Sequence, residues 1–292
     1  MHKNSDASKQ RLWRRILLIM TLLGVFYAAL TTAIREIAQP QLFHPNQDEG
    51  AHAALMMRSN TEFIEIPTAH GELSGFIRKA GDSPAPLLLY FGGNRDNASH
   101  MIRYLADNRA ATFRGWHLAM IDYPGYGLST GRPSDASLKR MALAAYDALS
   151  SREDVTEIVV LGYSIGTGPA NYVASKRGVS GLILMAPYAE GADLFNTVLD
   201  VFHGPLKLLV SYSMSSVTFA EDIAVRPLIF ATEQDELVPY ASAVRLSKAY
   251  PAGCEFVTVP GIQHGGFWHS GLVLNGIKAY LDAAAVNKQL PP

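Results

Sequence analysis

One short segment of the sequence combines a serine with two glycines in a spacing that can make the hydroxyl a nucleophile. It reads Gly162-Tyr163-Ser164-Ile165-Gly166, and it follows a β-branched apolar run and precedes a helical pattern. In a sharp turn from strand to helix, only small flanking residues let the chain pass itself, and the serine is strained and lifted clear of the sheet. The first turn of the following helix favours negative charge. We therefore predict that Ser164 is a catalytic nucleophile.

A serine hydroxyl is a weak nucleophile near neutral pH, so this hypothesis requires a general base and a carboxylate that orients the base. After such a turn, the acid and then the histidine come later in the chain, each in the loop that follows a strand. Asp235 follows the apolar run 227–231, and His264 follows the run 255–259 in a glycine-rich loop. The order and placement predict a triad of Ser164, Asp235 and His264.

Both partners of the serine have competitors close by in the sequence. Glu233 and Glu236 could replace Asp235, and His269 could replace His264. His269 falls at the expected start of the last helix, and the other seven histidines precede the serine or lie in a later insertion. We therefore prefer Asp235 and His264.

The tetrahedral intermediate of acyl transfer needs two N–H donors for its oxyanion. One should be the backbone N–H of Ile165, directly after the nucleophile. We assign the second to the backbone of Asn94, with Gly93 as the alternative, in the glycine-rich loop after the apolar run 87–91. Glycines there would let the backbone approach a substrate. The residues that we expect to contact the substrate are Gly93, Tyr163 and Tyr188.

Most of the chain from residue 60 to residue 287 alternates between short apolar runs and helical patterns. This alternation predicts a mostly parallel central sheet flanked by helices, with one antiparallel hairpin at its start. The expected strands are 61–67, 72–79, 87–91, 116–121, 157–161, 182–185, 227–231 and 255–259, and the expected helices are 98–113, 136–149, 165–176 and 270–285.

Five segments together resemble the α/β-hydrolases over about residues 60–285. They are the Gly92-Gly93-Asn94 loop, the stretch from Asp122 to Gly131, the elbow at Ser164, Asp235-x-x-Val238-Pro239, and Gly261-x-x-His264. The sequence is most similar to the branch of monoglyceride-lipase-like and serine-aminopeptidase-like hydrolases, and within it to membrane-attached Bem-type hydrolases and protein depalmitoylases. The resemblance implies an α/β-hydrolase fold and a serine hydrolase that forms an acyl-enzyme, without a cofactor. It says little about the substrate.

The chain departs from these relatives at two positions. They often have histidine where Gly92 stands and arginine where Pro124 stands. The first departure removes a side chain from the predicted oxyanion loop without touching the triad, and the second changes a loop beside the site.

Residues 190–224 interrupt the alternation, in the place where this fold usually carries a lid or cap. Leu194, Val198 and Val201 form a helical apolar stripe, and only six residues of the segment are charged. Such a cap could hold an acyl chain over Ser164, or its stripe could simply pack on the domain. A peptidase of this branch would instead need an acidic group for the substrate amine. Candidates for that group are Glu190, Asp193 and Asp200.

The N-terminal segment differs from the rest of the chain in composition, which indicates a separate function. Residues 16–34 form a run of 19 residues without a charge, which as a helix would span about 28 Å and cross a bilayer core. Five basic residues precede the run, so residues 1–15 should stay cytoplasmic and the domain at 41–292 should lie on the other side of the membrane. We prefer a single-pass signal anchor, periplasmic in a bacterium, over a cleaved signal peptide or a buried core helix.

Composition narrows the remaining choices. The formal net charge of −1 argues against a protein that grips nucleic acid. A single cysteine excludes an internal disulfide framework, and we assign no metal to the group Asp48, Glu49 and His52. We expect a small-molecule ester, a thioester or an acylated molecule as substrate. A peptidase with the same triad and a catalytically silent, membrane-anchored binding protein are the alternatives, and the oligomeric state stays open.

Overall fold

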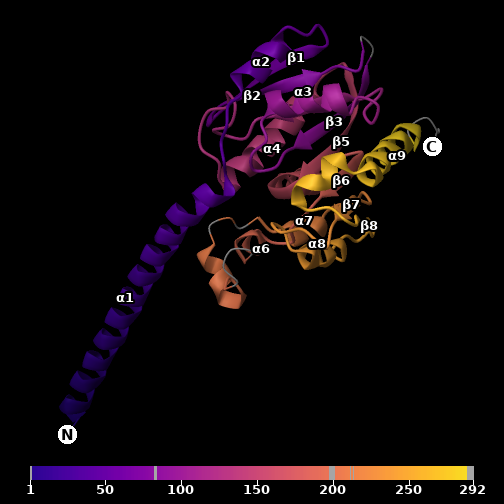
Figure 1. The fold of residues 1–292 in the computed structure, drawn as a ribbon. Coiled ribbons are helices and arrows are strands. Elements are labelled where there is room, and N and C mark those ends of the chain that lie inside the picture. Colours follow the sequence, from indigo (N-terminus) through magenta and orange to yellow (C-terminus); the bar gives the residue numbers. More distant parts are fainter. Residues whose placement is uncertain (1, 82–83, 197–200, 211, 213, 288–292) are drawn as a thin grey trace.

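The computed structural model describes residues 2–81, 84–196, 201–210, 212 and 214–287, and in this part of the chain one mixed sheet organises the fold (Figure 1). The strands are β1 (Thr61–Thr68), β2 (Gly71–Arg78), β3 (Ala85–Phe91), β4 (His117–Ile121), β5 (Val155–Tyr163), β6 (Gly181–Met185), β7 (Leu228–Ala231) and β8 (Glu255–Thr258). Their order in the sheet is β1-β2-β4-β3-β5-β6-β7-β8. β1 and β2 form an antiparallel hairpin, β2 pairs antiparallel with β4, and the remaining pairs are parallel. The predicted hairpin and mostly parallel sheet are confirmed.

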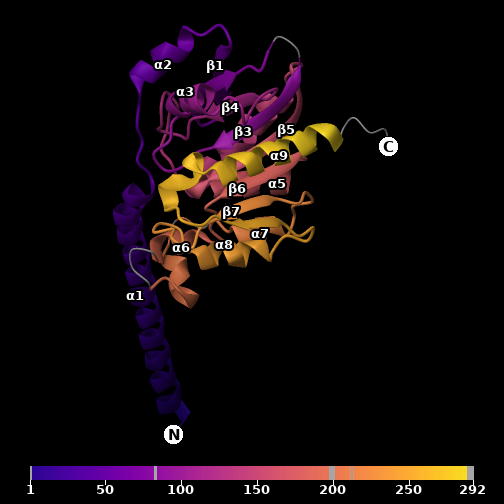
Figure 2. The same cartoon turned by 45° about the vertical axis from the view of Figure 1, so that its right-hand side comes forward.

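Helices cover both faces of this sheet (Figure 2). The helices are α1 (His2–Leu42), α2 (Glu49–Met56), α3 (Ala98–Asn108), α4 (Asp135–Ser150), α5 (Thr167–Lys176), α6 (Gly191–Asn196), α7 (Ser216–Ala220), α8 (Tyr240–Ser247) and α9 (Gly271–Asn287), with the 3₁₀ turns η1 (Ser164–Gly166), η2 (Gly204–Leu209) and η3 (His264–His269). Apolar side chains of α4, α5 and α8 join one buried cluster, and those of α2, α3 and α9 join the other.

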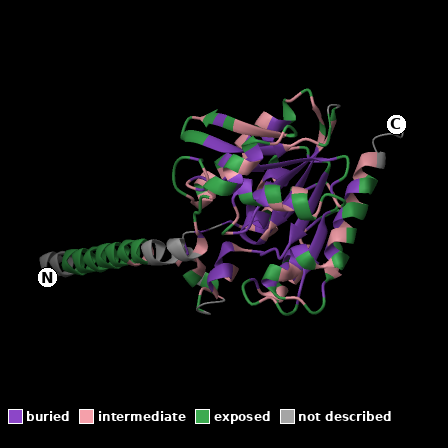
Figure 3. Cartoon of the chain, turned by 45° about the horizontal axis from the view of Figure 1, so that its top comes forward, coloured by how far each residue is buried: buried purple, intermediate pink, exposed green. Residues whose placement is uncertain are grey.

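The alternation of side chains along the strands explains why there are two clusters. Leu87 and Leu89 of β3 belong to the first cluster, whereas Leu88 and Tyr90 belong to the second. Successive residues of a strand point to opposite faces, so a strand that is apolar throughout is buried on both sides. Figure 3 shows these strands as the buried centre of the domain.

Helix α3 is shorter than the sequence pattern predicts. The expected helix ran over 98–113, but α3 ends at Asn108. Phe113 is fully buried, and its ring packs edge-on against Trp268 with 6.4 Å between ring centroids. A helix that continued past Asn108 would not turn back toward this contact, so tertiary packing overrides the helical propensity of the segment.

Helix α1 extends away from the domain (Figures 1 and 2). The stretch Lys9–Ala33 has 25 residues and a mean hydropathy of 2.1, and none of it is buried, so by length and composition it could cross a membrane. The alternative of a buried core helix is therefore wrong. The helix continues past the expected start of the domain at residue 41, and Phe43 then enters the core, where its ring meets that of Tyr212 edge-on.

The cap segment consists of α6, η2 and α7. Leu194 and Phe195 are buried in the first apolar cluster, as are Val210 and Tyr212, so part of the cap packs on the domain. Val198 and Asp200, which the sequence placed in the apolar stripe and among the candidate acids, lie outside the described residues. η2 contacts α1, and both views place the cap alongside this helix (Figures 1 and 2).

Candidate active site

The turn from β5 into α5 holds Ser164 in a conformation that side chains rarely adopt. Its φ is +55°, in the left-handed region. For a residue other than glycine, such a conformation costs about 1–3 kcal/mol and persists only when the surroundings enforce it. A Cβ on Gly162 would lie 2.7 Å from the carbonyl oxygen of Gly166, and a Cβ on Gly166 would lie 2.1 Å from that of Phe91. Both glycines are therefore sterically required.

The structure brings together the three side chains of the predicted triad. His264 Nε2 lies 2.9 Å from Ser164 Oγ, and His264 Nδ1 lies 2.9 Å from both Oδ1 and Oδ2 of Asp235. The side chains of His264 and Asp235 are only 7% and 2% exposed. Asp235 Oδ1 also accepts the backbone N–H groups of Leu237 and Val238, at 2.9 and 2.8 Å. These bonds fix the carboxylate, which in turn can hold the imidazole with Nε2 toward the serine.

The competing residues take other positions. Glu236 accepts the backbone N–H of His264 at 3.0 Å and so supports the loop rather than the imidazole ring. Glu233 is exposed. His269 lies 3.3 Å from Arg109 through its Nδ1 and meets the ring of Tyr104, away from Ser164.

Tyr163 supports the histidine from one side. Its ring stacks on that of His264, with 5.3 Å between centroids and 26° between planes, and its hydroxyl donates to the His264 carbonyl at 2.7 Å. Burial raises the pKa of Tyr163, so the hydroxyl keeps the proton that it donates. A Cβ on Gly93 would lie 3.2 Å from this ring, which places Gly93 beside Tyr163.

Tyr188 lies below the elbow and is fully buried. Its hydroxyl is 2.8 Å from that of Tyr212 and donates to the Ile165 carbonyl at 3.4 Å. Burial raises the pKa of Tyr188 well above its ordinary value. In this conformation Tyr188 supports the residue after the nucleophile from inside the domain.

The loop after β3, residues 92–97, holds the predicted oxyanion donor. The Gly93 N–H donates to Asp96 Oδ2 at 2.7 Å, which leaves Asn94 as the better candidate. The Asn94 carbonyl accepts the backbone N–H of His44 at 3.1 Å and the Tyr126 hydroxyl at 2.8 Å. The sequence analysis assigned no role to Asp96, Tyr126 or His44. The one signal for Asp96 was an acidic residue three positions after the glycine pair that ends an apolar strand.

Comparisons with known proteins agree with the fold. The sequence model of the family described as "alpha/beta hydrolase fold" matches residues 91–224. The alpha/beta hydrolase domain-containing protein WAV2 of Arabidopsis thaliana is 32% identical over 67% of this chain and 69% of its own length. The chain belongs to the α/β-hydrolase family.

Two further matches carry the same fold or family. The protein bem46 of Schizosaccharomyces pombe is 29% identical over 73% of this chain and 73% of its own length. The solved structure of the esterase Pf2001 of Pyrococcus furiosus superposes with a TM-score of 0.66 at 15% identity, and covers 82% of this chain and 98% of the other. The resemblance to Bem-type α/β-hydrolases is thus confirmed.

Asp48 and His52 of this α/β-hydrolase, which resembled part of a metal site in the sequence, make structural contacts. Asp48 caps α2 by accepting the Ala51 N–H at 2.8 Å, and the His52 ring packs edge-on against the rings of Phe63 and Phe76. Among the described residues, no group of three His, Cys, Asp or Glu side chains is arranged to hold a metal ion.

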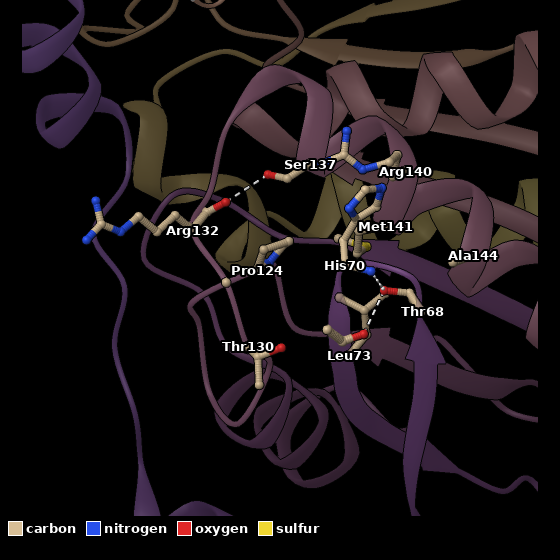
Figure 4. Close-up of a pocket in the computed structure, with 12 residues that line it drawn as sticks. Thr68, His70, Leu73, Pro124, Thr130, Arg132, Ser137, Arg140, Met141 and Ala144 are labelled. Atoms are coloured by element: carbon tan, nitrogen blue, oxygen red, sulfur yellow. Dashed lines mark hydrogen bonds between the residues drawn. The ribbon is translucent and has the colours of Figure 1, made fainter.

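A hollow of about 210 Å³ lies between the β1–β2 turn, the loop after β4 and helix α4 (Figure 4). Its hydroxyls are used within the protein: Thr68 accepts the His70 N–H, and Ser137 donates to the Arg132 carbonyl. The Arg132 side chain points away from the hollow. None of its lining residues belongs to the group around Ser164, so we assign it no part in the chemistry.

Proposed function

We propose that this α/β-hydrolase cleaves a carboxylic ester or thioester through an acyl-enzyme formed on Ser164. The observation that carries the proposal is the continuous chain of short contacts from Ser164 Oγ through His264 to Asp235. An arrangement of this kind lets a serine attack a carbonyl near neutral pH. The name of the esterase whose fold superposes on this chain is in keeping with an ester as substrate.

In the proposed reaction, His264 Nε2 takes the proton of Ser164 as Oγ bonds to the carbonyl carbon. The backbone N–H groups of Ile165 and Asn94 stabilise the oxyanion. The tetrahedral intermediate then breaks the bond to the alcohol or thiol, which leaves with the proton from His264. Water, deprotonated by the same imidazole, attacks the acyl-enzyme. The bond between the acyl carbon and Ser164 Oγ then breaks, the acid is released, and His264 returns the proton to Oγ. Asp235 stays ionised throughout and stabilises the imidazolium.

We further propose that residues 16–34 anchor the enzyme, with residues 1–15 in the cytoplasm and the hydrolase domain on the other side. Only one residue, Phe43, separates α1 from His44, whose N–H binds the oxyanion loop. This short connection keeps the catalytic domain near the membrane surface. Lipid-like or acylated substrates at that surface are therefore the first to test.

The peptidase alternative is less well supported by the contacts in the cap. Asp193 already accepts the Ser242 hydroxyl at 2.6 Å and the Glu190 N–H at 2.9 Å, and it pairs with Arg245. Glu190 pairs with Lys207. Carboxylates with these partners are not available to a substrate amine without losing them.

The deciding experiment compares the full chain with Ser164→Ala, both purified in detergent, on p-nitrophenyl esters from acetate to palmitate. We expect the substitution to lower turnover at least about 10³-fold, because it removes the nucleophile, while the melting temperature stays the same. A fluorophosphonate should label the wild-type chain and not the variant. The dependence on chain length shows whether the cap holds an acyl tail.

Two outcomes would decide against the ester proposal. Turnover of alanine p-nitroanilide alone would establish the peptidase. No turnover of any substrate, together with no labelling by the fluorophosphonate, would favour the catalytically silent binding protein.

A further inference from the structure

Asp96 holds the oxyanion loop from its inner side. One carboxylate oxygen, Oδ2, accepts both the Gly93 N–H at 2.7 Å and the Tyr90 hydroxyl at 2.8 Å. Burial raises the pKa of Asp96, and these two hydrogen bonds oppose the effect. A buried carboxylate is costly unless donors compensate for the lost water, so the arrangement of donors around Asp96 has to be well formed.

The space for this carboxylate exists because residue 92 is a glycine. A Cβ on Gly92 would lie 2.6 Å from Asp96 Cβ and 2.9 Å from its Oδ2. A side chain at position 92 and the observed conformation of Asp96 therefore exclude each other. The side chain that the resembling hydrolases often have at position 92 is absent here, and the carboxylate of Asp96 occupies the space above Gly92.

Asp96 also fixes the orientation of the next peptide group. Its backbone N–H donates to the Gly93 carbonyl at 3.2 Å. The C=O and N–H of a trans peptide point in opposite directions, so the Asn94 N–H points away from Asp96. The two bonds from Asp96 thus define both peptide planes that meet at Gly93.

We propose that Asp96 is a positioning residue, which binds Gly93 on both sides and so directs the Asn94 N–H as an oxyanion donor. This inference rests on the proposed hydrolase function of Ser164. No hydrogen bond joins Asp96 to the nucleophile or the base, but its charge interacts with that of His264 at a distance. Asp96→Asn removes this charge and keeps the hydrogen-bond acceptor, so it separates a direct charge effect from an effect through the loop.

The main test measures kcat and KM for ester hydrolysis by the full chain with Asp96→Ala or Asp96→Asn. Loss of one oxyanion donor costs about 10²–10³-fold in kcat, so a loosened donor should cost about tenfold or more. We expect this loss of kcat for Asp96→Ala with KM within about twofold, because the oxyanion forms only in the transition state. The amide oxygen of Asp96→Asn can still accept both hydrogen bonds, and this variant should recover most of kcat.

A second variant tests the role of the space above Gly92. Gly92→Ala should displace the carboxylate and lower kcat by about the same factor as Asp96→Ala. The double variant should then be no worse than either single variant, since both remove one interaction. Independent, multiplying losses would contradict the inference.

Asp154→Ala is the matched control. Its carboxylate accepts from Arg152 at 2.8 Å and lies 3.3 Å from Lys79, just before β5 and therefore at the end of the strand opposite Ser164. This substitution should lower the melting temperature and leave kcat within about twofold, because it touches neither the loop nor the triad. A purely structural Asp96 would behave like this control, and that result would overturn the proposal.

Amide hydrogen exchange of residues 92–97 provides a readout that does not depend on catalysis. Exchange should be faster in Asp96→Ala than in wild type, and unchanged in Asp154→Ala. Unchanged exchange in Asp96→Ala would overturn the inference even in an active enzyme. If wild-type turnover does not require Ser164, the proposed function fails, and faster exchange would still show that Asp96 orders the loop.

Discussion

The elbow at Ser164 and the oxyanion loop at residues 92–97 lie against each other but are held in different ways. The elbow is fixed mostly by its own residues: Gly162 and Gly166 let the chain pass, and Thr167 Oγ1 donates to the Ser164 carbonyl at 2.7 Å. The loop depends on distant segments. Its Asn94 carbonyl is bound by Tyr126 and His44, and the Arg95 carbonyl by Asn46, at 2.6 Å.

This difference means that the two halves of the site respond to different substitutions. Replacing a glycine of the elbow should disrupt the whole turn and abolish most of the activity. Substitutions around the loop should each lower the activity only a little, because several separate hydrogen bonds support the loop. The segment from residue 43 to 48 follows helix α1, which contains the proposed membrane anchor, so the loop is also the part of the site that is connected to this helix.

Replacing Gly166 by alanine should have the largest effect. The new Cβ would lie 2.1 Å from the Phe91 carbonyl oxygen and 2.5 Å from that of Gly92, so backbone on both sides must move. Overpacking costs about 1–3 kcal/mol and occasionally more, and backbone neighbours cannot rotate away. We expect a melting temperature lower by several degrees and little ester turnover in the protein that still folds. Thermal melts and turnover, measured on the same sample, check both.

Gly271→Ala is the control for this change. A Cβ on Gly271 would meet nothing within 4 Å, at the start of α9. Its melting temperature and turnover should match wild type. If Gly166→Ala behaved in the same way, the close passage of elbow and loop would not be needed.

Tyr126→Phe should have a smaller effect, because it removes one of the hydroxyl groups that support the loop. The hydroxyl donates to the Asn94 carbonyl at 2.8 Å and accepts the His44 N–H at 2.9 Å, so its removal takes one partner from each of these groups. Their bond to each other, at 3.1 Å, remains. Loss of one hydrogen bond costs about 1 kcal/mol, and we expect a fall in kcat of a few fold with KM unchanged. Steady-state kinetics on one ester measures this split.

Tyr146→Phe removes a comparable hydroxyl far from the site. That hydroxyl donates to the Gly178 carbonyl at 2.8 Å. The control should lose similar stability and keep its kcat. Equal losses of kcat in both variants would mean that the kinetic effect reflects general destabilisation rather than the loop.

The same contrast explains what the sequence could predict. Ser164, Asp235 and His264 could be predicted because Ser164 directly follows a strand and the other two lie in loops after later strands. The order of the strands then brings them to one edge of the sheet. The role of Asp96 was not accessible, because it depends on the distance between its side chain and Gly92 in the folded loop. Likewise the contact of His44 with the loop depends on where the end of α1 meets the domain. The order of the strands predicts which loops meet, whereas the side-chain contacts within and between these loops require the folded structure.

The last predicted effect concerns the pH dependence of stability, for which no change in kcat is expected, and it separates the loop from the elbow once more. Asp122 Oδ1 accepts the Ala98 N–H at 2.7 Å, where the oxyanion loop enters α3. Burial raises the pKa of Asp122 from 3.8 to about 7. Between about pH 4 and pH 7, the native state therefore keeps a proton on Asp122 that the unfolded chain has lost. The free energy of unfolding consequently declines as the pH rises through this range. No titratable side chain belongs to the elbow segment 162–167 apart from the Tyr163 hydroxyl, which stays protonated in this range.

Asp122→Asn replaces the carboxyl by a neutral group that can still accept the Ala98 N–H. Relative to this variant, the wild-type melting temperature should fall by a few degrees between pH 5 and pH 8. Only the wild type has a buried carboxyl whose ionisation is unfavourable in the native state. Asp107→Asn is the control: Arg58 holds the pKa of Asp107 below its ordinary value, so Asp107 is ionised throughout this range and its removal should add no slope. If the melting temperatures of wild type and Asp122→Asn changed equally between pH 5 and pH 8, Asp122 would not titrate in this range. The end of the loop would then be as independent of pH as the elbow.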